Sequence, residues 1–100
     1  MKPTTKSVGG TSFHMDVIYA TVEQLRQVLG EPVYVANYGD DKVNFEWEME
    51  TEDGAVFTVY DWKEYRPLSE DEGIHWHIGG NRRIDTEKAA DEINYALNQL

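Results

Sequence analysis

Two histidines placed two residues apart are the side chains in this sequence best suited to chemistry. His75 and His77 lie in the segment IHWHI, where apolar and polar residues alternate as they do in a β-strand. Successive side chains of a strand point to opposite faces, so both imidazoles are expected on one face. Together with a carboxylate from Asp61 or Glu46, they are ligand types that bind zinc or another divalent ion. A His-x-His pair alone is a weak signal, because surface histidines paired with nearby carboxylates are more common.

The same region offers groups for proton transfer but no complete catalytic set. Asp61, Glu64 and the two histidines are of the types used in acid–base or hydrolytic reactions. No nucleophile or oxyanion-hole motif accompanies them. The sequence has no cysteine, which excludes disulfides, thiolate catalysis and cysteine-ligated metal sites. We therefore expect a non-enzymatic protein without a cofactor. The alternative is a small metal-binding or hydrolytic protein built on His75, His77 and Asp61.

Acidic residues give the strongest signal. The chain has 19 acidic and 9 basic residues, for a net charge of −10. Glu46, Glu48 and Glu50 alternate with apolar residues, so a strand would present them as a ladder with steps of about 6.7 Å, similar to neighbouring phosphates of a nucleic acid. Such a ladder can occupy a basic groove built for nucleic acid, through contacts that salt weakens. The alternative is a solvated strand face that keeps a small protein soluble.

The ladder belongs to a predicted β-hairpin, VNFEWEME and AVFTVYDW, joined by a turn that contains Asp53-Gly54. A hairpin loop with an even number of residues puts Phe57, Val59 and Asp61 on the carboxylate face with the two histidines. The same parity puts Val56, Thr58, Tyr60 and Trp62 in the core. Apolar side chains among charges are typical of a contact surface, either for a partner or for a homodimer.

The remaining elements complete one domain over residues 11–100, after a flexible lead at residues 1–10. A strand is predicted at residues 11–19. A helix follows at residues 22–29, with a capping box between Thr21 and Gln24. A final helix is predicted to begin at Asp85 or Thr86. The order β-α-β-β-β-α favours an α+β two-layer sandwich, in which both helices cover one face of an antiparallel sheet of about four strands.

Charge and composition also restrict the partners. So acidic a protein is repelled by nucleic acid and by anionic membranes, and the sequence contains no apolar run of membrane-spanning length. Residues 1–10 lack the apolar centre of a signal peptide. We therefore expect a cytoplasmic protein, acting in a host cell as a monomer or homodimer, that binds neither nucleic acid nor membrane directly. Its expected partner is a protein with a basic, nucleic-acid-binding surface.

Four segments resemble those of small bacteriophage and prophage proteins: GGTSF at residues 9–13, LGEP at 29–32, FTVYDWKEY at 57–65 and HWHIGG at 75–80. The resemblance carries over no catalytic residue. It implies a phage-type inhibitor that binds a host defence protein, as anti-CRISPR proteins and restriction inhibitors do.

The leading hypothesis is therefore a phage-type inhibitor of a basic host defence protein, most simply an anti-CRISPR protein that blocks a Cas effector by mimicking nucleic acid. A phage accessory protein that self-associates is a further alternative. The predicted contact residues are Asp40, Asp41, Glu46, Glu48, Glu50, Phe57, Val59, Asp61, Glu70, Asp71 and Glu72.

Overall fold

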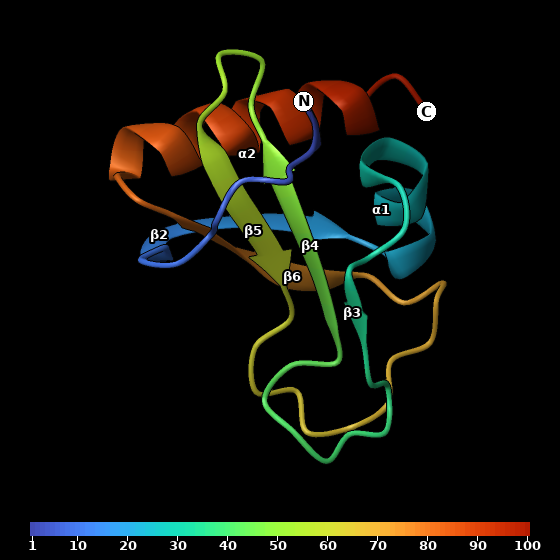
Figure 1. The fold of residues 1–100 in the computed structure, drawn as a ribbon. Coiled ribbons are helices and arrows are strands. Elements are labelled where there is room, and N and C mark those ends of the chain that lie inside the picture. Colours follow the sequence, from blue (N-terminus) through green and yellow to red (C-terminus); the bar gives the residue numbers. More distant parts are fainter.

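The protein is described by a computed structural model of residues 1–100, which contains one antiparallel sheet, with strands of different lengths, and two helices (Figure 1). The elements are β1 (Lys2–Pro3), β2 (Ser12–Ala20), α1 (Val22–Leu29), β3 (Tyr34–Val35), β4 (Phe45–Glu50), β5 (Val56–Tyr60), β6 (Ile74–Gly80) and α2 (Arg83–Leu97). The strand order is β1-β4-β5-β6-β2, and β3 pairs with the same edge of β4 as β1 does. The predicted α+β sandwich with two helices is confirmed. The sheet has six strands rather than about four, because two short two-residue strands join its edge.

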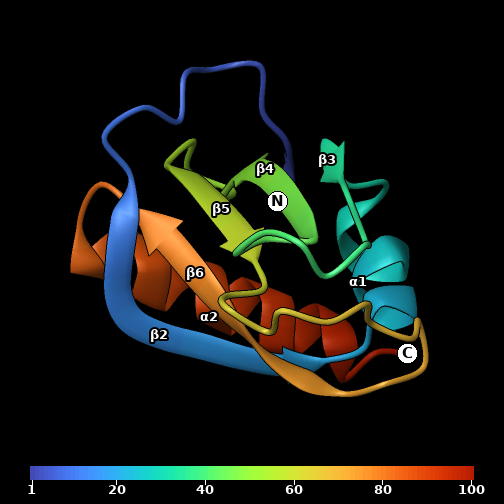
Figure 2. The same ribbon diagram turned by 90° about the horizontal axis from the view of Figure 1, so that it is seen from below.

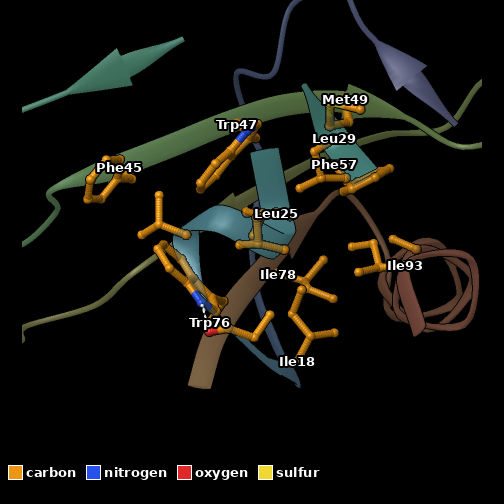
Figure 3. Close-up of a cluster of buried hydrophobic side chains, with 14 of the residues drawn as sticks. Ile18, Leu25, Leu29, Phe45, Trp47, Met49, Phe57, Trp76, Ile78 and Ile93 are labelled. Carbon is orange, nitrogen blue, oxygen red and sulfur yellow. Dashed lines mark hydrogen bonds between the residues drawn. The ribbon is translucent and has the colours of Figure 1, made fainter. Parts of the chain in front are cut away.

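Both helices pack on one face of the sheet, and the core lies between the two layers. Figure 3 shows Leu25 from α1 and Ile93 from α2 directed into the same cluster as Trp47 and Trp76. The two indoles meet edge to face, with ring centroids 5.5 Å apart. Each buried indole N–H is satisfied, since Trp47 donates to the Gly30 carbonyl and Trp76 to the Ala20 carbonyl. Buried aromatic area of this size is a major source of stability.

The helix limits agree with the sequence at α1 and differ at α2. Thr21 and Gln24 form the predicted capping box, and α1 spans the predicted residues. Helix α2 begins at Arg83, before the predicted Asp85 or Thr86, and no side chain caps its first turn. Thr86 is buried inside the helix, where its hydroxyl donates to Asp16 of β2. This hydrogen bond gives Thr86 a structural role, so the cap signal in the sequence was misplaced.

The hairpin between β4 and β5 has an odd loop, and this reverses the predicted faces of β5. The Thr51 amide donates to the Ala55 carbonyl, and the Gly54 amide donates to the Thr51 carbonyl. Gly54 has a φ of 89°, as the last residue of a three-residue turn with a bulge requires. Trp47 therefore pairs with Val59, and Met49 pairs with Phe57. A change of one residue in register moves every side chain of a strand to the opposite face.

The N-terminal residues, which the sequence predicts to be a flexible lead, contribute to the sheet. Lys2 and Pro3 pair with β4, and the Thr4 amide donates to the Glu48 carbonyl. Figure 2 shows the following segment arching over the side of β4 and β5 that faces away from α2. The side of the sheet without helices is thus partly covered by the chain's own N-terminal segment. Neither helix has the length and apolar composition needed to cross a membrane.

Candidate functional site

A row of side chains crosses the open face, which is the side of the sheet that no helix covers. The strand register places Tyr34, Glu46, Tyr60, His77 and Val17 opposite one another across β3, β4, β5, β6 and β2. Residues paired across neighbouring strands share a face, so these five side chains lie side by side. The open face therefore carries aromatic and ionisable groups together.

Aromatic rings gather around His77. Its imidazole stacks on the Phe13 ring with the ring centroids 4.0 Å apart. The centroids of Tyr60 and Trp62 lie 5.5 and 6.2 Å from that of the imidazole. Tyr60 and Trp62 meet at 6.0 Å with their planes 80° apart. We call Phe13, Tyr60, Trp62 and His77 the aromatic cluster. Burial among these rings lowers the pKa of His77, so the neutral imidazole is favoured.

A pocket of about 250 Å³ opens beside the aromatic cluster. Glu46 is the only charged residue in its lining. Gly79 leaves room for the Thr58 side chain, because a Cβ at that position would lie 2.5 Å from the Thr58 hydroxyl oxygen. Val8, Thr11 and Ser12 contribute further lining from the N-terminal part of the chain. The lining residues are Val8, Thr11, Ser12, Val43, Glu46, Thr58, Tyr60, Trp62 and Gly79.

Glu46 and Glu50, at the two ends of the ladder, have different environments. Burial, and then hydrogen bonding to Glu48 and the charge of Glu48, raise the pKa of Glu46 to about 7. Glu50, in contrast, accepts a hydrogen bond from Thr4 and lies near the ammonium groups of Lys2 and Lys6, and these contacts lower its pKa. The ladder is therefore not a uniform row of free charges, because Glu50 is already neutralised within the chain.

Two lysines flank the site. The ammonium groups of Lys42 and Lys63 lie 5.7 and 5.6 Å from the ring centroid of Trp62. The other seven basic side chains of the protein are each within an ion pair. The exposed Trp62 ring thus already attracts cations from its own chain, as expected for the face of an indole.

Phe57, Val59 and Asp61 do not lie on the open face, and their predicted placement was wrong. Phe57 and Val59 are fully buried in the core, so a homodimer face built on them does not exist in this fold. The physical reason is the odd hairpin loop described above. The same shift moves Tyr60 and Trp62 out of their predicted core positions, and 39% of Trp62 is exposed.

Asp61 is also fully buried, and its carboxylate holds the start of β4. One oxygen accepts the backbone amides of Asn44 at 2.8 Å and Phe45 at 2.9 Å, and the other accepts the Asn44 side-chain amide at 2.9 Å. A carboxylate with this many partners is structural. It is available neither to a partner protein nor to a metal ion at the surface.

The predicted acidic loop residues are distributed over two loops that pack together, as the lower part of Figure 1 shows. The Asn37 side chain joins the loops through both the amide and the carbonyl of Leu68. Asp40, Asp41 and Asp71 are exposed. Glu70 and Glu72 are in ion pairs, with Arg26 and Arg66 respectively.

The groups of the predicted metal or acid–base site are not brought together. His75 and His77 share the open face, but each contacts aromatic rings. The ring centroids of His75 and Tyr19 are 5.0 Å apart, and His77 stacks on Phe13. Glu64 pairs with Arg66, while Asp61 lies in the interior. No group of three or more histidine, aspartate or glutamate side chains is arranged to hold a metal ion.

Sequence reasoning missed Phe13 and Trp62 as members of the site. Phe13 lies before an irregularity of β2 in which Met15 has a φ of 76°, so simple alternation along this strand does not give the faces. Trp62 follows the register of β5, which depends on the hairpin loop. No family model matches the chain, and no match was found among curated proteins or solved structures.

Proposed function

We propose that this protein is a binding protein that attaches the open face of its sheet to a basic surface of a protein partner. The observation that carries the proposal is the aromatic cluster beside Glu46 and Glu48 on a protein of net charge −10. Tyrosine and tryptophan anchors are typical of the residues that dominate binding energy at interfaces. A negative surface around them would steer a positive partner toward the site.

The partner class that best fits is a host defence protein that handles nucleic acid, such as a CRISPR effector, with the chain acting as its inhibitor. Charge supports this choice, since a nucleic-acid-binding groove is rich in lysine and arginine. The resemblance to phage proteins supports the context. The carboxylates that would meet such a groove are Glu46 and Glu48 and the exposed loop residues Asp40, Asp41 and Asp71. Glu50 is omitted because Lys2 and Lys6 already neutralise it.

The experiment has two stages. A pull-down from bacterial lysate with the tagged protein, washed at low and then high salt, identifies candidate partners by mass spectrometry. The deciding stage uses the purified partner with its own nucleic acid substrate. Increasing amounts of the protein should displace the nucleic acid or block its cleavage, and the inhibition should weaken as salt rises.

Matched variants locate the contact. Trp62→Ala and Glu48→Gln should weaken binding to the purified partner by about tenfold or more each, the range of interface hot spots. Tyr95→Ala removes an aromatic ring and Glu87→Gln removes a carboxylate at exposed positions of α2, on the helical side, and both should leave binding unchanged. If the α2 variants lose as much affinity as the open-face variants, or if neither pair of variants loses affinity, the open face is not the binding surface.

A further inference from the structure

The pocket beside the aromatic cluster has a chemical preference of its own. It is small, about 250 Å³, so it suits a side chain rather than a cofactor. Its walls include the rings of Tyr60 and Trp62, and its only charge is that of Glu46. Aromatic faces and a carboxylate both attract cations, and neither attracts anions.

We propose that this pocket takes one arginine side chain of the partner, with the guanidinium against the aromatic rings and donating to Glu46. This inference rests on the proposed function, because the arginine comes from the basic surface that the open face binds. It names the anchor of that interface and the pocket that receives it.

Arginine fits better than lysine for geometric reasons. A guanidinium is planar, stacks on aromatic rings and presents a fork of N–H donors to a carboxylate, whereas an ammonium is a compact and strongly hydrated charge. Ser12 and Thr58 also line the pocket, and their hydroxyl oxygens can accept hydrogen bonds from the remaining N–H groups. The size of the pocket, its charge and its hydrogen-bonding groups thus all correspond to an arginine side chain.

The electrostatics of Glu46 agree with a missing positive charge. Glu48 is the charged neighbour on its own strand, and the groups facing it from other strands are Tyr34, Tyr60 and His77. None of these supplies a cation near neutral pH, since burial lowers the pKa of His77. A guanidinium in the pocket would restore the ionised form of Glu46 and release the proton that it holds. Binding should therefore be stronger at pH 8 than at pH 5.5.

Lys42 and Lys63 point to the competing possibility, an anion held at the rim of Trp62. They lie over the indole, outside the lining of the pocket. The experiment therefore includes an anion. Amide proton–nitrogen spectra of the labelled protein would be recorded while adding the tripeptide Gly-Arg-Gly, Gly-Lys-Gly, Gly-Glu-Gly or inorganic phosphate.

The arginine peptide should shift the signals of the Trp62 indole and of the Glu46, Tyr60 and Gly79 amides, more strongly than the lysine peptide does. The Trp62 indole is the reporter of choice, because the Trp47 and Trp76 indoles belong to the core and donate to backbone carbonyls. Glu46→Gln and Trp62→Ala should each weaken binding of Gly-Arg-Gly by about fivefold or more. Tyr95→Ala should leave it unchanged, and unaltered signals elsewhere report an intact fold.

Several outcomes would overturn the inference. These are shifts caused by phosphate or the glutamate peptide and not by the arginine peptide, unchanged affinity in Glu46→Gln, or equal affinity at pH 5.5 and pH 8. The peptide experiment needs no protein partner, so the two proposals fail separately. Peptide binding without any protein target would refute the proposed function alone. A target whose binding is weakened by Trp62→Ala and Glu48→Gln, but which binds Glu46→Gln as tightly as the unaltered protein, would refute the arginine pocket alone.

Discussion

Replacing Asp61 tests whether this carboxylate is structural, as its burial indicates, or part of a site, as the sequence suggests. Asp61→Ala removes the acceptor of the two backbone amides of Asn44 and Phe45 and of the Asn44 side chain. The Asn44 side chain keeps its hydrogen bond to the Arg66 carbonyl. The two backbone donors lose their acceptor in a buried position, where each unsatisfied group costs about 1–3 kcal/mol.

The expected loss in the free energy of unfolding is therefore about 3 kcal/mol or more, a large part of the roughly 5–15 kcal/mol available to a domain. For a chain of this size the melting temperature should fall by about 12 °C or more. Asp61→Asn keeps one carbonyl oxygen for the backbone amides but turns a donor toward the Asn44 side chain, so its loss should be intermediate. Asp40→Ala, an exposed aspartate of the adjoining loop, should change stability by less than about 0.5 kcal/mol.

Urea denaturation followed by tryptophan fluorescence measures these losses, and amide hydrogen exchange at Asn44 and Phe45 reports whether the start of β4 opens. A loss below about 1 kcal/mol in Asp61→Ala, with unchanged exchange at both amides, would refute the structural assignment. A stable Asp61→Ala protein that no longer binds its partner would return Asp61 to the functional site. A structural role for Asp61 thus predicts a loss of stability in Asp61→Ala, whereas a functional role predicts a loss of binding with stability retained.

Three further predictions concern the sheet and its connections. The pKa of Glu46 is raised from 4.5 to about 7, so the folded protein holds a proton that the unfolded chain releases, and stability should fall as pH rises from about 4.5 to about 7. In urea denaturation at a series of pH values, Glu46→Gln should remove this decline. At pH 8 it should raise the free energy of unfolding by about 1 kcal/mol, after allowance for solvent screening. Gly39→Ala should be far more destabilising in thermal unfolding than Gly10→Ala. Both residues have positive φ, but only at Gly39 would a Cβ meet backbone atoms, 2.7 Å from the Arg66 Cα; equal losses would contradict this. Thr21→Ala removes one hydrogen bond of the capping box and should cost about 1 kcal/mol in the same assay, and no loss would show that α1 is held by packing alone.

The elements that the sequence predicts well are those with local signals. The capping box at Thr21 and Gln24 fixes the start of α1, because both partners lie within one helical turn. The alternation in β4 gives its two faces correctly, and the α+β class follows from the order of the elements. The strands β1 and β3 escape such reasoning, since two residues are too few to show a period. Their pairing with β4 is decided by contacts distant in sequence.

The candidate site was only partly predictable, because its composition depends on register. Glu46, Glu48, His75 and His77 were expected on the open face and lie there. Phe13 was not expected, because the irregularity in β2 breaks the alternation that the pattern assumes. The pairing of Lys2 and Pro3 with β4 was not expected either, since nothing in residues 1–10 predicts these hydrogen bonds.

Side-chain polarity within β5 could have decided the register without any structure. The predicted register places the Tyr60 hydroxyl and the Trp62 indole N–H in the core, where each needs a hydrogen-bond partner. It also exposes Phe57 and Val59, whose side chains have no polar atom to interact with water. The observed register buries Phe57 and Val59 and leaves Tyr60 half-buried and Trp62 exposed. That choice also explains how an aromatic surface persists without a partner. Tyrosine, tryptophan and histidine each carry a polar atom that can form hydrogen bonds with water, so an aromatic surface made of them is tolerable in the free protein.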